Sequence, residues 1–290
     1  MLAILKIRSL KTILLFLCAL GIAACLCSLK APSSVRQALK SIPQEEQCFL
    51  DYFFRTLLLK DSGIYVLTGS KPAALSAILD PSYYQSTILW KGFYRGTLFK
   101  KGLEVWKKYQ HLFPSNHFCF LYNNDEDGIK VFLINKKQFI EEMTRNIEDF
   151  KAAFGMHITA EGLIDMANIQ QQYFLQILDN HVALKGIILG YGKHNSHLFQ
   201  QRDVLRNAAL PKKQELIEKK MRNLDEKLGL VESAISPLQF ASMPAFACDL
   251  MHPETQDLLK KYALGKRTAS SLYQNGSFLE TTLKLIKDSS

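Results

Sequence analysis

The sequence predicts an α+β protein that is predominantly α-helical, with one small β-hairpin or sheet in its first half and a helical second half. Two observations favour this class. Two β-rich runs, residues 118–122 and 129–135, flank a short polar loop, which is the pattern of a hairpin. From residue 159 onward, apolar residues recur at helical spacing between glycines and prolines, and no internal repeat is visible.

The first thirty residues have the composition of an export signal. Lys6, Arg8 and Lys11 give a basic start without acids, residues 12–24 are almost wholly apolar, and small residues precede Cys25. We therefore expect a membrane-anchored protein of the cell envelope, with the bulk of the chain outside the cytoplasm.

The leader leaves three outcomes open. Residues 22–25 resemble a bacterial lipobox, and this resemblance implies that Cys25 becomes the first mature residue and carries the lipid as a thioether. Alternatively, the uncharged residues 13–29 stay as an uncut anchor, at the short end of what spans a bilayer. In the third outcome, cleavage after Gly21, with Ala19 at position −3, gives a secreted protein.

The length and composition suit one globular domain. The chain has 290 residues, of which 48% are hydrophobic and 22% charged, with eighteen Phe and eleven Tyr to fill a core. We expect a signal peptide or N-terminal membrane anchor over residues 1–24 and a tether over 25–44. Residues 45–290 then form a single domain, with a candidate subdivision near residue 155.

The start of this domain predicts short elements. Residues 45–60 form a helix rich in aromatic side chains, and residues 64–68 are a short β-like run. A turn follows, and Pro72 is well placed at the first position of a helix over residues 73–79.

Helices dominate the sequence after the hairpin. Residues 136–154 carry apolar side chains at helical spacing, and Gly155 follows as a stop. Thr159 is placed to cap a short helix. Further helices are expected over residues 168–189, 197–210, 212–228, 254–264 and 277–287, the second of them capped by Asn195 or Ser196.

The net charge and the cysteines indicate which partners and chemistries to expect. The net charge of +9 favours anionic partners such as lipid headgroups or another envelope component. Nucleic acid is not expected, because the densest basic run, residues 212–227, is interleaved with acids and reads as a solvated helix face. Cys48, Cys119 and Cys248 have apolar neighbours, as buried free thiols do, and no Cys-x-x-Cys motif indicates zinc or redox chemistry.

The loop between the two β-rich runs has the spacing of half a calcium site. Asn123, Asp125, Asp127 and Gly128 match its first positions, but Ile134 stands where a bidentate glutamate is needed. We interpret the loop as a hairpin turn, and the sequence predicts no metal and no cofactor.

The best polar cluster follows two glycines. Gly190 and Gly192 precede Lys193, His194 and Asn195, and the pattern lacks the third glycine and the preceding strand of a dinucleotide fingerprint. A helix–glycine–helix corner is the favoured interpretation. His197 follows His194 at a spacing that could bring both rings together, but no further ligand at that spacing completes a metal site.

No known nucleophile motif is present, although a triad assembled from distant residues has no sequence signature. The catalytic candidates come from the polar cluster and are Lys193, His194, Asn195 and His197. A second stretch mixes rings with cations and suits either the core or a surface for sugars or anionic lipid. It contains Tyr83, Tyr84, Trp90, Lys91, Phe93, Tyr94, Arg95, Phe99, Lys100 and Lys101.

Two blocks resemble exported or envelope proteins of chlamydia-like intracellular bacteria that have no assigned activity. The first runs from Phe53 to Pro72 and ends in Thr-Gly-Ser-Lys-Pro, where those proteins often have Phe-Gly-Asp-Lys-Pro. The second runs from Gly186 through His194 and Asn195 to Phe199. The resemblance implies an envelope location and carries over no catalytic residue.

These observations favour a membrane-tethered envelope protein that acts by binding or scaffolding, with an unidentified protein partner. An envelope hydrolase with a dispersed active site is the first alternative, and a secreted effector that binds a host partner is the second. A hydrolase requires a concave pocket in which a histidine meets a Ser, Cys or carboxylate. A binding protein instead exposes an apolar or aromatic surface.

Overall fold

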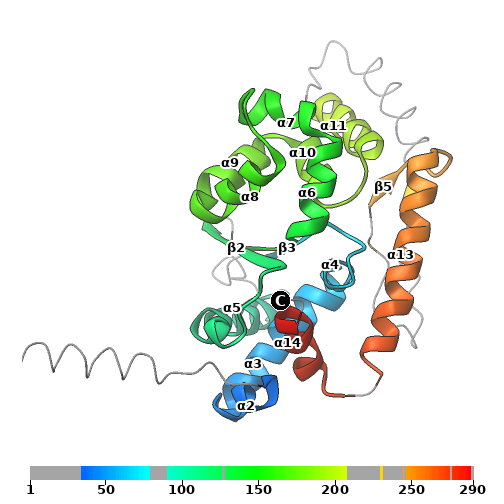
Figure 1. Ribbon diagram of the computed structural model, residues 1–290. Helices are drawn as coiled ribbons and strands as arrows, with labels where there is room; N and C mark the ends of the chain where they lie inside the picture. Colours follow the sequence, from blue (N-terminus) through cyan, green and yellow to red (C-terminus); the bar gives the residue numbers. More distant parts are fainter. Residues whose placement is uncertain are drawn as a thin grey trace, which may run out of the picture. The chain divides into compact units, whose positions relative to one another are not determined.

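The structure is a computed structural model that describes residues 34–78, 90–125, 128–207, 229–230, 244, 246–274 and 276–288. Its contacts divide the chain into two compact units, Met1–Ser41 and Ile42–Ser290. In the first unit the described part is the short helix α2 (Val35–Lys40), whose N-cap Ser34 accepts the Gln37 N–H at 3.2 Å. The second unit contains the other elements (Figure 1).

A three-stranded antiparallel sheet lies at the centre of the second unit. The strands β1 (Ala73–Ile78), β2 (Phe118–Asp125) and β3 (Gly128–Asn135) take the order β1-β3-β2. Ala73 pairs with Ile134, and Phe118 pairs with Asn135. The predicted hairpin and the predicted fold class are both confirmed.

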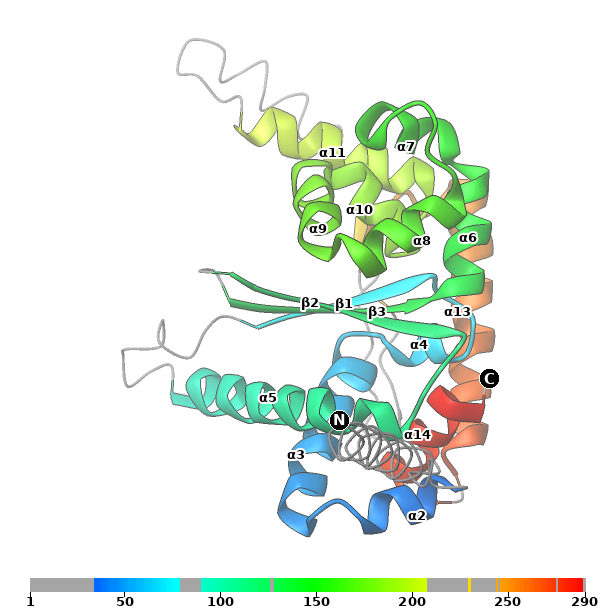
Figure 2. The same cartoon turned by 60° about the vertical axis from the view of Figure 1, so that its left-hand side comes forward.

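Helices cover both faces of this sheet (Figure 2). One layer holds α6 (Lys136–Arg145), α7 (Ile147–Phe154), α8 (Ala160–Ile169), α9 (Gln171–Asn180), α10 (Val182–Ile188) and α11 (Lys193–Asn207). The opposite layer holds α3 (Gln44–Arg55), the π-helix η1 (Thr56–Lys60), α4 (Ile64–Leu67), α5 (Trp90–Tyr109), the 3-10 turn η4 (Gln110–Leu112) and α14 (Phe278–Asp288). The long helix α13 (Pro253–Leu272) runs beside both layers.

Alternation along the strands divides the core between the two layers. Leu121, Phe132 and Ile134 pack into the α6–α11 layer with a largely aliphatic cluster. Phe120 and Tyr122 face the other way, where the Trp106 ring lies 5.0 Å from the Phe120 ring and donates its N–H to the Tyr122 hydroxyl at 2.8 Å. The layer containing α3 and α5 is therefore held together by aromatic rings.

Two short elements differ from the sequence prediction. Residues 64–68 contain α4 instead of a β-like run, and residues 73–79 contain β1 instead of a helix that starts at Pro72. The β-branched Ile64 and Val66 suggested a strand, but the sheet takes the next segment because β1 pairs with β3 along its whole length. Distant pairing overrides local propensity at this point.

Two predicted long helices are broken. The helix expected over residues 136–154 is α6 and α7, separated at Asn146, whose amide group bonds the Glu142 carbonyl at 2.9 Å. The helix expected over residues 168–189 is replaced by the end of α8, α9 and α10, which meet at Gln170 and His181. These breaks occur without proline or glycine, so the apolar spacing alone did not reveal them.

The predicted Thr159 cap and the last two predicted helices are present. Thr159 caps α8 and accepts the Gly162 N–H at 3.0 Å, as predicted. The last two helices are present as α13 and α14, and α13 is longer than expected. The helix expected over residues 212–228 lies outside the described residues. A two-residue ladder, β4 (Gly229–Leu230) with β5 (Ala247–Cys248), adds a little strand to the second half.

In α5, the side chains of the mixed aromatic and basic stretch differ in exposure. Phe99 is fully buried in the core, whereas Arg95 and Lys101 are exposed. Tyr83, Tyr84 and the side chains of residues 90–94 lie outside the described residues. Cys119 and Cys248 are partly or fully buried free thiols, but Cys48 is exposed, so the prediction of burial was wrong there.

Candidate functional site

The predicted polar cluster lies at the corner between α10 and α11. Gly190 and Gly192 have φ values of +76° and +84°, a region that side chains with a Cβ rarely occupy. The corner turns the chain so that α11 begins at Lys193. Asn195 and Ser196 therefore lie inside the first turn of α11, and the prediction that one of them caps a helix starting at residue 197 was wrong.

The cap of α11 comes from a different helix. The Glu254 carboxylate, at the start of α13, accepts the backbone N–H groups of Lys193 and His194, both at 2.9 Å. A carboxylate at this position satisfies two unpaired donors and interacts favourably with the helix dipole. A Cβ at Gly192 would lie 2.8 Å from the carboxyl carbon of Glu254, so the cap requires glycine there.

Asn195 joins the corner to two distant segments. Its side-chain amide donates to the Tyr191 carbonyl and to the Thr255 hydroxyl, both at 2.9 Å, and its oxygen accepts the Asp249 N–H at 2.9 Å. The side chain is 1% exposed. Asn195 therefore holds the site in place, and we assign it no contact with a substrate.

A pocket of about 540 Å³, which we call the histidine pocket, lies over the first turns of α11. Three of the four predicted candidates line it, namely Lys193, His194 and His197, together with Gln201 and His252. The His194 Nε2 atom lies 3.3 Å from Asp249 Oδ2. Its ring stacks on His252 with the centroids 3.7 Å apart and the planes within 7°. A histidine thus meets a carboxylate beside a concave surface.

The surroundings keep Asp249 in its charged form. Burial by itself raises the pKa of this carboxyl, but the Met251 N–H and the His194 ring together lower it below its usual range. The charged carboxylate can accept a hydrogen bond from Nε2–H of His194, in the tautomer that carries this proton. Asp249 and His194 form an acid–base pair that the fold holds through Asn195.

Lys193 and His197 share a second carboxylate, Asp149 of α7. The Lys193 Nζ atom lies 2.7 Å from Asp149 Oδ2, and the His197 Nε2 atom lies 3.6 Å from Asp149 Oδ1. Both basic side chains are more exposed than His194. The contact of His197 with Asp149 has the same composition as the contact of His194 with Asp249. It therefore serves as the control for any role assigned to His194 and Asp249.

The residues described around the pocket include bases but no hydroxyl or thiol nucleophile. Its described lining has no Ser, Thr or Cys, so water is the nucleophile that the geometry supports. Among the described residues, no group of three or more His, Cys, Asp or Glu side chains could hold a metal ion.

Sequence reasoning missed the partners of the candidate residues. Asp149, Asp249, His252 and Glu254 come from α7, from the β5–α13 segment and from α13, so no local spacing connects them to α11. The one signal in the sequence is His252-Pro253-Glu254, in which a proline and a glutamate mark a helix start. That pattern predicts α13 but not the contact of Glu254 with α11.

Lys71 is a second feature that the sequence did not reveal. The side chain is 1% exposed, and no carboxylate among the described residues pairs with it. Its Nζ atom lies 4.9 Å from the centroid of the Tyr191 ring. Burial lowers the pKa of Lys71 to about 7, because the charged form of the amine loses its hydration.

Comparisons with known proteins found no match for this chain among family models, curated proteins or solved structures. The resemblance to exported proteins of chlamydia-like bacteria therefore stays a prediction. Among the described helices, none has both the length and the apolar character needed to cross a bilayer. The leader and Cys25 lie outside the described residues.

Proposed function

We propose that this chain is a membrane-tethered protein of the cell envelope that acts by binding, and that it lies against an anionic membrane through one face of α5. The leader supports the tether, through lipidation at Cys25 or through an uncut helix. The observation that carries the proposal is a group of lysines on α5, which we call the lysine face.

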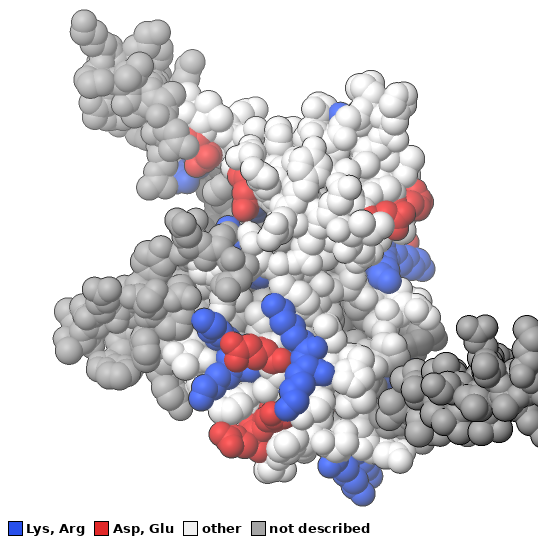
Figure 3. Space-filling model, turned by 90° about the vertical axis from the view of Figure 1, so that its left-hand side faces the viewer, with Lys and Arg blue, Asp and Glu red and all other residues white. Residues whose placement is uncertain are grey.

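The lysine face consists of Lys100, Lys101, Lys107 and Lys108, arranged around Glu104. At 100° per residue, these five positions fall within about one third of the helix circumference. Figure 3 shows basic side chains gathered around acidic ones on the lower part of the molecule. Lys101, Lys107 and Lys108 are exposed and Lys100 is half-buried.

Aromatic rings contact two of these amines without neutralising them. The Lys101 Nζ atom lies 5.1 Å from the Phe49 ring centroid, and the Lys107 Nζ atom lies 4.7 Å from the Tyr122 ring centroid. Lys108 pairs with Glu46 at 2.8 Å and is 57% exposed. Four positive charges therefore face Glu46 and Glu104, which leaves this surface basic.

The chain enters the second unit beside the lysine face. The unit begins at Ile42, and α3 begins at Gln44. Glu46 and Phe49, in the first two turns of α3, contact Lys108 and Lys101. The tether that leads from the proposed anchor therefore ends next to these lysines. This order along the chain favours a membrane as the anionic partner.

The expected strength is modest and depends on salt. A lysine close to an anionic leaflet contributes about 1 kcal/mol, and the attraction falls off within about 8 Å at physiological ionic strength. Four lysines that oppose two glutamates are too weak to hold a free protein firmly. They are sufficient to orient a protein that is already tethered.

Lysine acetylation in vesicles tests the orientation. The full chain is reconstituted into vesicles of phosphatidylcholine alone or with a third of phosphatidylglycerol, and acetylation of each lysine by an N-hydroxysuccinimide ester is followed by mass spectrometry. We expect several-fold protection of the lysine face in the anionic vesicles, lost in 0.5 M salt. Lys260, an exposed lysine of α13, is the control. Equal rates in both vesicles would contradict the proposal.

Hydrolysis is the second candidate function, and the contact between His194 and Asp249 favours it. With Nε2–H of His194 donating to Asp249, the Nδ1 atom is the base. It takes a proton from water as the water oxygen attacks an ester carbonyl, and it returns that proton to the leaving oxygen when the ester C–O bond breaks.

A matched pair of variants tests the hydrolase. Turnover of p-nitrophenyl butyrate by the full chain is compared for His194→Asn and His197→Asn, since both histidines line the same pocket and each faces an aspartate. A hydrolase that uses His194 loses about a hundredfold or more in the first variant and stays within about threefold in the second. Equal losses, or no turnover by the wild type, would remove this candidate.

A further inference from the structure

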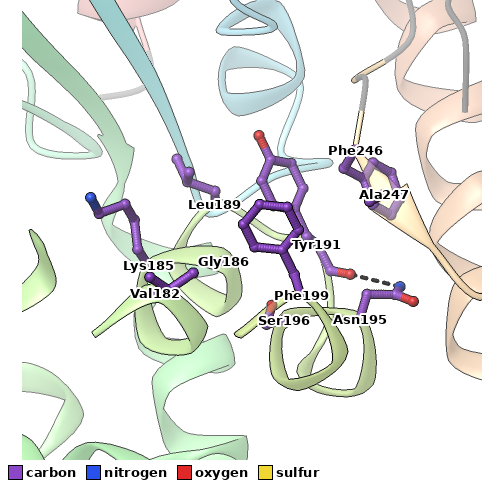
Figure 4. Close-up of a pocket in the computed structure, with 10 residues that line it drawn as sticks. All are labelled: Val182, Lys185, Gly186, Leu189, Tyr191, Asn195, Ser196, Phe199, Phe246 and Ala247. Atoms are coloured by element: carbon purple, nitrogen blue, oxygen red, sulfur yellow. Dashed lines mark hydrogen bonds between the residues drawn. The ribbon is translucent and has the colours of Figure 1, made fainter. Parts of the chain in front are cut away.

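An apolar cavity lies on the other side of the α10–α11 corner (Figure 4). Its volume is about 290 Å³. The apolar side chains around it come from α10, the corner, α11, β5 and the residue before β5, and they are Val182, Leu189, Tyr191, Phe199, Phe246 and Ala247. None of these residues belongs to the histidine pocket or to the lysine face.

The walls of the cavity are aromatic. The Tyr191 and Phe246 rings stack with their centroids 5.1 Å apart and their planes within 10°. Figure 4 shows these two rings and the Phe199 ring gathered around the cavity. Phe199 is 41% exposed, so a large apolar side chain stands open to solvent next to a preformed apolar space. Such a space favours an apolar ligand.

The floor forms where α10 and α11 touch. A Cβ at Gly186 would lie 2.5 Å from Ser196 Oγ, so the two helices approach as closely as glycine allows. The Ser196 hydroxyl donates to the Gly192 carbonyl at 2.6 Å, and the Asn195 amide is used by Tyr191 and Thr255. The polar groups of the floor are already satisfied, so the buried part of a ligand must be apolar.

The size of the cavity limits the ligand. An apolar cavity of about 150 Å³ is large enough for benzene, and this cavity has about twice that volume. By this comparison it holds roughly ten carbon atoms. A medium-length acyl chain fits, whereas a complete two-chain lipid does not.

A cation marks the edge of the cavity. The stem of Lys185 lines it, and in Figure 4 the amine is directed away from the rings. The Lys185 Nζ atom lies 2.5 Å from Asp179 Oδ1, and the Lys130 Nζ atom lies 3.2 Å from Asp179 Oδ2. One carboxylate is therefore shared by two amines. Because a lysine amine has three N–H donors, an anionic group at the edge would share the Lys185 amine with Asp179.

We infer that this cavity binds a fatty-acid anion with one acyl chain of about ten carbons. Its tail lies among Tyr191, Phe199 and Phe246, and its carboxylate lies beside Lys185. The apolar walls select the tail, the satisfied floor excludes polar ligands, and the edge selects an anionic headgroup. This site is independent of the tether and of the lysine face.

Photolabelling tests the assignment in membranes that contain the full chain. The probe is decanoic acid with a diazirine near its methyl end, and the labelled residues are found by peptide mass spectrometry. We expect the label on residues of the cavity wall, displaced by decanoate at about three- to tenfold lower concentration than by decanol. Lys185→Gln should remove that preference for decanoate.

A cavity-filling variant provides the control. Ala247→Phe places a ring in the space and should reduce labelling at least tenfold, while Leu264→Ala, at an exposed position of α13, should leave labelling unchanged. Melting curves confirm that both variants fold. Label scattered over the surface, or unaffected by Ala247→Phe, would overturn the site. Equal displacement by decanol and decanoate would overturn the carboxylate.

Discussion

The two faces of the sheet carry different kinds of structure. On one face of the sheet (Figure 2), two of the longer helices, α3 and α5, pack through aromatic rings. The Phe54 and Trp106 rings, for example, have their centroids 5.1 Å apart. On the opposite face, α6–α11 are mostly short helices joined by corners, and their core is mostly aliphatic with a few phenylalanine rings. The aromatic layer presents the lysine face, and the short-helix layer presents the cavity and the histidine pocket.

The number of helix ends explains why both pockets lie in the layer of mostly short helices. Each helix end leaves unpaired N–H and C=O groups that need partners, and a layer of six mostly short helices has many ends. Glu254 and Asn195 provide such partners, and they bring His194, Asp249 and His252 together as a consequence. A long helix such as α5 offers a continuous solvent face instead. Substitutions on each side should therefore have different effects.

The largest effect is expected in the aromatic layer. Trp106→Ala removes a ring that is 2% exposed and contacts Phe54, Phe113 and Phe120, so it should lower the free energy of unfolding by about 3–5 kcal/mol. Urea unfolding of the full chain followed by circular dichroism measures this. Lys107→Ala, at the next position, should change it by less than about 1 kcal/mol. A similar loss in both would contradict the assignment of the core.

Lys71→Met should act in the opposite direction. The folded protein lowers the pKa of Lys71 to about 7, so between pH 7 and about 10 the unfolded chain binds more protons. Burying the amine therefore destabilises the fold most below pH 7, and this penalty shrinks as the pH rises. The variant should gain up to about 4 kcal/mol at pH 7 and about 1 kcal/mol near pH 10. A gain in the free energy of unfolding that does not change with pH would contradict a lowered pKa for Lys71.

Asn195→Ala should have an intermediate effect in the short-helix layer. It leaves the Asp249 N–H and the Thr255 hydroxyl without their partner, which should lower the free energy of unfolding by about 2–3 kcal/mol. Gln201→Ala, at an exposed position of the same helix, should be nearly neutral. Thermal melts compare the two. Equal stability of both variants would show that Asn195 does not hold the corner.

The smallest effect on stability is expected at the mouth of the cavity. Phe199→Ala changes a side chain that is 41% exposed, so the free energy of unfolding should fall by no more than about 1 kcal/mol. Labelling by the decanoate probe should nevertheless fall several-fold, because one wall of the cavity is lost. Unchanged labelling at unchanged stability would place the ligand elsewhere.

The sequence predicted what depends on local pattern. The hairpin of β2 and β3, the Thr159 cap and the glycine corner before Lys193 all follow from residues close together in the chain. The exchange of helix and strand at α4 and β1 could not be predicted, because pairing with β3 decides it.

The site shows the same division. Lys193, His194 and His197 were identified because they are adjacent in sequence, and the structure places all three beside one pocket. Asn195 has the same neighbours in sequence but is buried, and no spacing rule distinguishes it from them. The partners Asp249 and Glu254 lie more than fifty residues away, so their contacts are a product of the fold alone.

Metabolic labelling with palmitate, followed by cell fractionation, tests the central claim that the chain is tethered outside the cytoplasm. We expect envelope-bound protein that takes up the label through Cys25 and loses it in Cys25→Ser. Unlabelled full-length protein in the membrane fraction would replace the lipid by the uncut helix and keep the tether. Intact chain in the cytoplasmic extract, or processed chain in the culture medium, would contradict the claim.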